Sequence, residues 1–374
     1  MKALHAATCL ALLAAGPARA AAPDAAPLQV QFRSGTASDW IPSETLKGAG
    51  IFFHARVDGR DAIVFLYGGP THIDRTFVPA DAAPTAVLTV EAGGLTLHNL
   101  SAVKTDAAES LARAAGAPVP LILGENVFDR LIVDIDSAHH RLAFRDPAAI
   151  AKPKDAVEVP LVARDGERVV PLSLDGAPPA LFEIELGNTS GPLLVTPGYA
   201  QAHQLQENRP VSQRLSGQFV EKVVTLNRLG FAGLDLDHVP IAIVPDAALP
   251  PPSITGGVGW PLLQRFHLII DYPHDRLFAI ANADAAQASE LKDRIGVALA
   301  PRDDGFAVTF VSSGSPAEAA GLKIGDDIVA IDGKPVKALN AFTVTTLRFA
   351  DAGQTFALTL KDGGVRQVKA ADFF

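Results

Sequence analysis

Two short stretches of the chain place a polar side chain where an apolar strand runs into a glycine turn. Residues 65–74 read Phe-Leu-Tyr-Gly-Gly-Pro-Thr-His-Ile-Asp, and residues 182–191 read Phe-Glu-Ile-Glu-Leu-Gly-Asn-Thr-Ser-Gly. A strand that ends in such a turn can present one side chain at the mouth of a cleft. The presented residue is Tyr67 in the first stretch and Glu185 in the second.

These two side chains differ in the chemistry that they offer. A carboxyl group such as that of Glu185 can accept and donate a proton, whereas a phenol, with an ordinary pKa of about 10, stays protonated near neutral pH and is a poor base. Two carboxyl groups that share one proton can activate a water molecule. Tyr67 and Glu185 together supply only one carboxyl group.

The glycines and aspartates that follow these stretches recur at matching distances. Gly124 precedes Asp136 by 12 residues, and Gly259 precedes Asp271 by the same 12 residues. An Arg-Leu pair then follows each aspartate at one offset. Because three landmarks coincide, we predict an internal duplication.

Strand-like patterns support this duplication and suggest its limits. Residues 94–103 and 233–242 both alternate apolar and polar side chains, as half-buried strands do. Proline and charge interrupt the strand pattern at 146–155. We therefore expect one β domain at 28–148 and its copy at 157–284.

Length and composition agree with several β-rich domains. The chain has 374 residues, of which 48% are hydrophobic and 20% charged, so it can bury two or three apolar cores. Its 31 glycines and 28 prolines favour short strands and turns over long helices. We expect a mainly β protein.

A third module is expected at 290–374. Its pattern predicts a short helix that Ser315 caps and Gly321 ends, followed by a strand at 328–331. A second helix is expected from Asn340 to about Phe349, and a final strand at 356–360.

The first two modules resemble the retropepsin-like aspartic peptidases of bacteria, in which an apolar strand delivers Asp-Thr-Gly and a later apolar pair plus Gly packs beneath it. Tyr67-Gly68-Gly69 and Glu185-Leu186-Gly187 stand at the places of the two triplets. The later element matches Ile-Leu-Gly at 122–124 and Gly-Val-Gly at 257–259. The resemblance covers about 48–282. It implies two tandem acid-protease β-barrel lobes whose catalytic positions are Tyr67 and Glu185.

The third module resembles the PDZ domains of exported bacterial proteases. The sequence Ser-Pro-Ala-Glu-Ala-Ala-Gly-Leu-Lys-Ile-Gly-Asp-Asp-Ile-Val-Ala-Ile-Asp-Gly at 315–333 carries this resemblance. It implies a β fold with two short helices that binds a peptide as an added strand, with the peptide's terminal carboxylate on a turn of backbone N–H groups. The implied binding residues are Arg294, Ile295, Gly296, Val297, Leu299, Phe342 and Leu347.

We expect from these features an exported, catalytically degenerate peptidase-like protein that binds peptide or protein chain ends. Glu185 reaches about one methylene farther than an aspartate, and a displacement of about 1 Å can slow a reaction roughly a hundredfold. The alternative is an active aspartic-type endopeptidase that uses Glu185 and an unrecognised second acid. Strand geometry does not aim Asp61 or Asp74 into the cleft, and Asp136 and Asp271 are expected to close a strand before a turn. A third possibility is a scaffold that binds no ligand.

Other candidate residues point to structure. His139-His140 lacks the spacing of a metal site and reads as a solvated turn, so neither a metal nor another cofactor is expected. Ser190-Gly191 lies outside a nucleophile motif, and Trp260 reads as a core aromatic residue. The last residues, Asp-Phe-Phe at 372–374, resemble a PDZ ligand, which makes docking of the chain's own end a further hypothesis.

The first 20 residues read as a secretion signal. Lys2 precedes an apolar run at 6–15, and Ala18-Arg-Ala20 is a small-residue cleavage site. The run, which contains the only cysteine, Cys9, is too short to span a bilayer. We expect a periplasmic or secreted protein without stable membrane insertion. A net charge of −9 with no basic cluster argues against nucleic acid as a partner.

Overall fold

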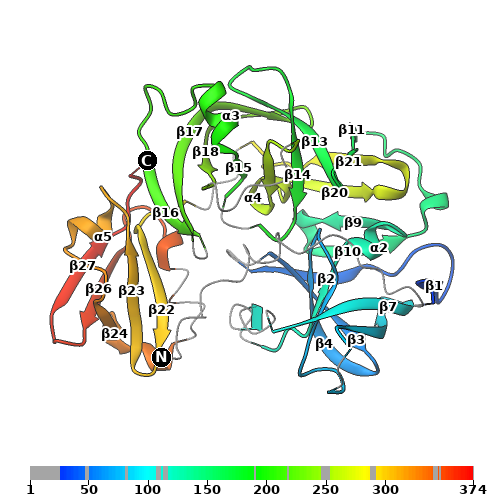
Figure 1. Ribbon diagram of the computed structural model, residues 1–374, viewed down its shortest axis with the longest axis horizontal. Helices are drawn as coiled ribbons and strands as arrows, with labels where there is room; N and C mark the ends of the chain where they lie inside the picture. The colour runs from blue at the N-terminus through cyan, green and yellow to red at the C-terminus, as the bar shows by residue number, and fades with distance from the viewer. Residues whose placement is uncertain are drawn as a thin grey trace.

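The structure is a computed structural model that describes residues 26–46, 50–80, 83–106, 111–112, 117–188, 191–216, 219–245, 253–286, 292–339, 344 and 347–373. These residues form a mainly β protein with sheets of 13, 8 and 6 strands (Figure 1). The expected secretion signal at 1–20 and the candidate binding residue Phe342 lie outside them. None of the helices in the described ranges is both long and apolar enough to cross a membrane.

The first half of the chain is built around an inserted strand. A turn at Asp58 and Gly59, both with positive φ, joins β3 to β4. β8 then lies between β4 and β5, parallel to β4 and antiparallel to β5. The elements are β1 (Gln29–Phe32), β2 (Ile41–Leu46), β3 (Gly50–Val57), β4 (Arg60–Leu66), β5 (His72–Asp74), β6 (Thr85–Ala92), β7 (Leu95–Thr105), β8 (Leu121–Leu123), α2 (Glu125–Phe128), β9 (Ile132–Asp136), η1 (Ser137–His139), β10 (Arg141–Arg145) and η2 (Pro147–Ala149).

The second half repeats this arrangement. β19 lies between β14 and β15, parallel to β14 and antiparallel to β15. Each of the long strands β7 and β18 contains one residue with positive φ, Asn99 in β7 and His238 in β18. This recurrence agrees with the duplication that the glycine and aspartate spacing predicts. The elements are β11 (Val157–Pro160), β12 (Val162–Arg164), β13 (Glu167–Leu174), β14 (Ala180–Glu185), β15 (Leu193–Val195), α3 (Pro197–Ala202), β16 (Ser212–Ser216), β17 (Phe219–Phe231), β18 (Leu234–Ile243), β19 (Gly256–Gly259), α4 (Trp260–Leu263), β20 (Phe266–Asp271), η4 (Tyr272–His274) and β21 (Arg276–Ala281).

The two halves meet where β9 pairs with β20. The strands are antiparallel, and Asp134 lies opposite Ile269. These two residues are 135 positions apart, as are Gly124 and Gly259, so a local twofold axis passes between them. One sheet therefore runs through both halves, which the expectation of two β-barrel lobes did not include.

Aromatic side chains fill the core on both sides of this joint. Phe128 of α2 packs on Tyr272 of the second half, with ring centroids 5.4 Å apart. Phe231 meets Phe266 at the same 5.4 Å, edge to face. Trp260 is buried in the same cluster, as predicted for a core aromatic residue.

The third module forms the separate six-stranded sheet. Its first helix is capped by Ser315, whose Oγ accepts from the N–H of Glu318, and it ends before Gly321, as predicted. The expectation that the strand at 356–360 is the last is wrong, because β27 pairs with β26 after it. The elements are β22 (Val297–Arg302), β23 (Gly305–Val311), α5 (Pro316–Ala319), β24 (Asp327–Ile331), β25 (Lys334–Pro335), η5 (Val336–Ala338), η6 (Leu347–Phe349), β26 (Thr355–Leu360) and β27 (Val365–Lys369).

The hairpin of β16 and β17 holds the third module against the second half, and Figure 1 shows β16 beside the module. The hydroxyl of Ser312 donates to the carbonyl oxygen of Gln213. Ser212 and Ser312 are buried with their Oγ atoms 3.2 Å apart, so Ser212 donates in that second bond. Nη1 of Arg348 donates to the carbonyl oxygen of Leu215 at 3.2 Å.

We predict that Gly259→Ala destabilises the protein. A Cβ at this position would lie 2.1 Å from the carbonyl oxygen of Gly191, and backbone cannot move aside as a side chain can. We expect the free energy of unfolding in urea to fall by about 1–3 kcal/mol or more. Gly198→Ala in α3 is the matched control, since its Cβ would meet nothing within 4 Å, and it should shift stability by less than about 1 kcal/mol. Equal effects of the two substitutions would contradict the close approach of these backbones.

Candidate functional site

The ends of β4 and β14 occupy equivalent positions in the two halves. β4 lies parallel to β8, which leads to the glycine before α2, and β14 lies parallel to β19, which ends at the glycine before α4. Tyr67 directly follows the β4 residue that pairs with Leu123, and Glu185 directly follows the β14 residue that pairs with Val258, so the two pairings match. The structure thus brings the two predicted positions into correspondence across the twofold axis.

The ring of Tyr67 lies between the two glycine turns. It is stacked on Phe65, with ring centroids 6.3 Å apart. A Cβ at Gly187, in the opposite turn, would lie 2.5 Å from Cδ2 of Tyr67. Burial raises the pKa of Tyr67 above its ordinary value, and the nearby carboxyl of Glu185 adds to the rise. At physiological pH, Tyr67 is therefore a neutral phenol that fills the space between the turns.

The carboxyl group of Glu185 lies against β19 of its own half. A Cβ at Gly257 would lie 2.0 Å from Oε1 of Glu185, so the carboxyl occupies the space that a side chain at 257 would need. Nδ2 of Asn188 donates to Oε2 at 2.6 Å. Burial raises the pKa of Glu185 to about 7, although the Asn188 hydrogen bond opposes the rise. Glu185 thus changes charge near neutral pH.

Glu183 is a second acid beside Glu185 that the sequence reasoning missed. It pairs with Gly257 across the parallel strands, so its side chain is next to the carboxyl of Glu185. Burial, Glu185 and then Glu167 raise the pKa of Glu183 to about 9. The alternation Phe-Glu-Ile-Glu at 182–185, which puts both acids on one face of a strand, is the signal that could have revealed it.

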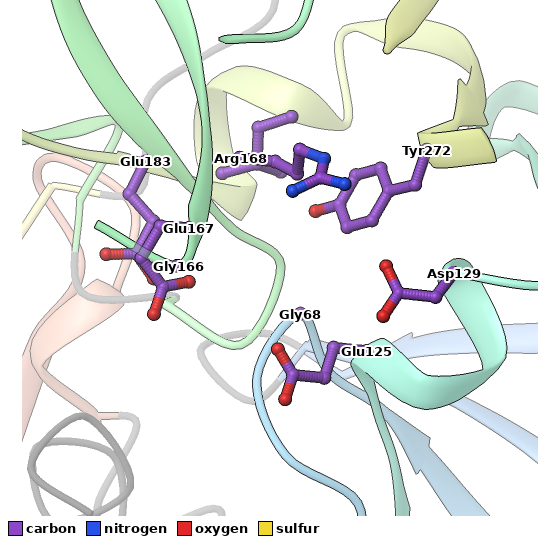
Figure 2. A pocket seen from close by; sticks show the side chains of 9 residues that line it. Gly68, Glu125, Asp129, Gly166, Glu167, Arg168, Glu183 and Tyr272 are labelled. Atoms are coloured by element: carbon purple, nitrogen blue, oxygen red, sulfur yellow. The ribbon is translucent and has the colours of Figure 1, made fainter. Parts of the chain in front are cut away.

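Further acids surround a pocket between the halves (Figure 2). Figure 2 shows Glu183 and Glu167 from the second half on one side and Glu125 and Asp129 from the first half on the other. Arg168 also lines this pocket and forms an ion pair with Asp275 at 3.2 Å. Within the described ranges, no group of three or more His, Cys, Asp or Glu side chains could hold a metal ion.

The arrangement of acids differs from a pair that faces across a cleft. Glu183 and Glu185 belong to one strand, and the equivalent position in the other half holds Tyr67. The neutral phenol of Tyr67 fills the space between the two turns, and the ionisable carboxyl of Glu185 lies over Gly257. These groups can donate and accept hydrogen bonds, but they do not form a symmetric dyad.

Asp136 and Asp271 are structural in both halves, as predicted. Asp136 ends β9 and binds the ring of His139 and the guanidinium of Arg141. Asp271 makes the same two contacts with His274 and Arg276. His139 thus belongs to a turn, as expected for His139-His140.

Five of the seven predicted peptide-binding residues of the third module lie in one turn and the edge strand that follows it. Arg294, Ile295 and Gly296 lead into β22, which begins at Val297 and lies at the edge of the six-stranded sheet. Leu299 and Leu347 are partly buried and pack on the module's core. Phe342 lies outside the described residues, so its predicted place in the pocket remains a prediction.

The turn that was expected to bind a terminal carboxylate holds a carboxylate of the chain itself. Oδ1 of Asp293 accepts from the backbone N–H of Ile295 at 3.1 Å and of Gly296 at 2.6 Å. Asp293 is buried, which raises its pKa, and the charge of Arg348 opposes the rise. Arg294 is also engaged, because its Nε donates to Asp372 at 2.7 Å.

Comparison with known families agrees with this geometry. Residues 294–370 match the PDZ domain family. The chain therefore carries a PDZ domain at its C-terminal end, and this class of domain binds peptides. A search of curated proteins finds no match to the chain.

We predict that Glu183 makes the protein less stable as the pH rises. In the folded chain Glu183 keeps its proton until about pH 9, whereas the ordinary pKa is 4.5, so its contribution to stability is present below pH 4.5 and is lost as pH rises towards 9. Glu183→Gln removes this loss. The difference between the free energy of unfolding of Glu183→Gln and that of wild type should be larger at alkaline pH than at acid pH. The increase should be at least about 1 kcal/mol, the equivalent of one pKa unit.

Urea unfolding at a series of pH values measures this difference. Glu44→Gln is the control, because Glu44 lies exposed on β2. A Glu183→Gln difference as flat with pH as that of Glu44→Gln would contradict the burial of a protonated Glu183.

Proposed function

We propose that the chain is an exported protein in which two retropepsin-like lobes, at 28–148 and 157–284, precede a PDZ domain at 290–374, and that it binds polypeptide without cleaving it. The recurring strand order, with a glycine-ended strand inserted beside each presenting strand, supports the two lobes. The signal-like residues 1–20 support export to the periplasm or outside the cell.

The position of Tyr67 carries the proposal that cleavage is lost. The peptidase mechanism requires two carboxyl groups that hold one water molecule between them. Tyr67 stands where the first of these carboxyls would be, and its ring packs against Gly187 of the opposite turn. Glu185 stands at the second place, but its carboxyl is bonded to Asn188 and lies over Gly257.

Peptide binding is assigned to the PDZ domain. Among the described strands, β22 pairs only with β23, so it is an edge strand of the kind that can accept a further strand. The partner would be an extended stretch of polypeptide. The protein would then act as an adaptor that is related to a peptidase.

Glu183 keeps a second function open. An endopeptidase that used Glu183 and Glu185 as its two acids would have two neighbouring carboxyls with separated pKa values, about 9 and about 7. Adjacent residues on one face of a strand do not place a water molecule symmetrically between them, which favours the binding function.

Incubation of the mature protein, residues 21–374, with unfolded casein from about pH 3 to pH 8 tests the proposal. We expect no fragments by mass spectrometry from wild type, Glu185→Gln or Glu183→Gln, because no carboxyl dyad is present. A commercial aspartic peptidase in parallel shows that the substrate is cleavable. Cleavage by wild type that Glu185→Gln abolishes would overturn the proposed function and support the endopeptidase.

A further inference from the structure

We propose that this PDZ domain binds internal extended segments of a polypeptide and does not require a free C-terminal end. The inference rests on the proposed peptide binding and defines which part of a polypeptide is bound. Two carboxylates of the chain itself, those of Asp293 and Asp372, already engage the groups that would hold the ligand's terminal carboxylate.

Asp293 supplies the first of these carboxylates. It lies two residues before Ile295 and three before Gly296, and one of its oxygens accepts from both of their N–H groups. Only 7% of Asp293 is exposed, so the carboxylate is part of the interior of the turn. A ligand's carboxylate would have to displace it from both donors.

Asp372 supplies the second carboxylate. It forms ion pairs with Arg294 at 2.7 Å and with Lys292 at 3.8 Å. The N–H of Ala371 bonds to the carbonyl oxygen of Arg294, which fixes the end of the chain beside the turn. The basic side chain expected to attract a terminal carboxylate is therefore engaged within the chain.

Two further contacts close this end of the binding edge. A Cβ at Gly296 would lie 3.2 Å from Cζ of Phe373, so this ring lies against the turn. On the other side of the turn, the carbonyl oxygen of Arg348 accepts from the N–H of Arg294. Nη1 of Arg348 donates to the carbonyl oxygen of Leu215 in the β16–β17 hairpin. The turn is thus enclosed by the chain's end and by the second half.

The engaged donors favour an internal segment as the occupant. A terminal carboxylate placed at the turn would have to compete with Asp293 for the two N–H groups and with Asp372 for Arg294. An internal segment brings uncharged peptide groups, which need only the hydrogen-bonding edge of β22.

That edge is short, and no strand of the described residues pairs with it. Val308 directs its N–H and C=O to the loop at Gly325 and Asp326, so Leu299, opposite Val308, directs its own N–H and C=O away from β23. Pro301 lacks an N–H and ends the useful part of the edge. A bound segment would therefore pair with residues 297–300.

A peptide array provides the test. Decapeptides of varied sequence are synthesised in three forms: with a free C-terminal carboxylate, with a C-terminal amide, and with a Gly-Ser extension that makes the decapeptide internal. The mature protein, residues 21–374, is applied, and the affinity for each bound sequence is then measured in solution by fluorescence anisotropy. We expect the three forms of one sequence to bind within about threefold of each other.

Asp293→Asn and Asp372→Asn test the cause. In Asp293→Asn the new side-chain amide can still accept from the two N–H groups but carries no charge. Position 372 is exposed, so Asp372→Asn still provides the test if Asp293→Asn does not fold. Each variant should bind the free-acid form more tightly than the amide, by about fivefold or more. Asp362→Asn is the matched control, because Asp362 accepts from the N–H of Gly364 in a similar turn, in the hairpin of β26 and β27.

Each outcome has a separate meaning. Wild type that prefers the free acid by about tenfold or more would overturn the inference and leave peptide binding intact. The inference would also be overturned if Asp293→Asn and Asp372→Asn behaved like Asp362→Asn. If no peptide in any form bound to wild type, the proposed function itself would fail.

Discussion

The pairing of β9 with β20 is the contact on which the rest of the structure depends. It places the local twofold axis between Asp134 and Ile269, and so it sets where both glycine turns meet. At this axis the symmetry of the side chains is broken, because Asp134 is buried and bonded to Arg145 and His267, whereas Ile269 is apolar. His267 of the second half thus bonds a buried carboxyl of the first half, which ties the two halves together at the joint.

The backbone frame around the two glycine turns is more alike in the two halves than the side chains of Tyr67 and Glu185 that it presents. Backbone requirements are shared by both halves, since the glycines before α2 and α4 each touch the backbone of the turn beside them. The side chains at the two presenting positions are free of that requirement, and there the halves differ, with a phenol in one and a carboxyl in the other. The same frame thus holds a different chemical group at each of the two equivalent positions.

The sequence predicted what depends on backbone geometry and local pattern. The glycine and aspartate spacing indicated the repeat, and Ser315 and Gly321 marked a helix correctly because caps are local. Glu183 escaped notice because its raised pKa arises from burial beside Glu185 and Glu167, which are brought together by strand pairing. Asp293 was not predicted although its bonds reach only two and three residues ahead, because the sequence does not show that its carboxylate is buried in the turn and faces the two N–H groups. β27 was missed because its sequence is mostly polar and only Val368 in it is buried.

The serine contact between the hairpin and the PDZ domain bears on how this domain can be studied. Ser212 of the second half and Ser312 of the PDZ domain are both buried, and the hydroxyl of Ser312 bonds to Ser212 and to the carbonyl oxygen of Gln213. A PDZ fragment cut free near residue 292 would expose Ser312 and leave Arg348 without Leu215. The side of the domain that packs on the β16–β17 hairpin would then face solvent. The ligand preferences of this domain therefore belong to the intact protein, and an isolated fragment would report on a different surface.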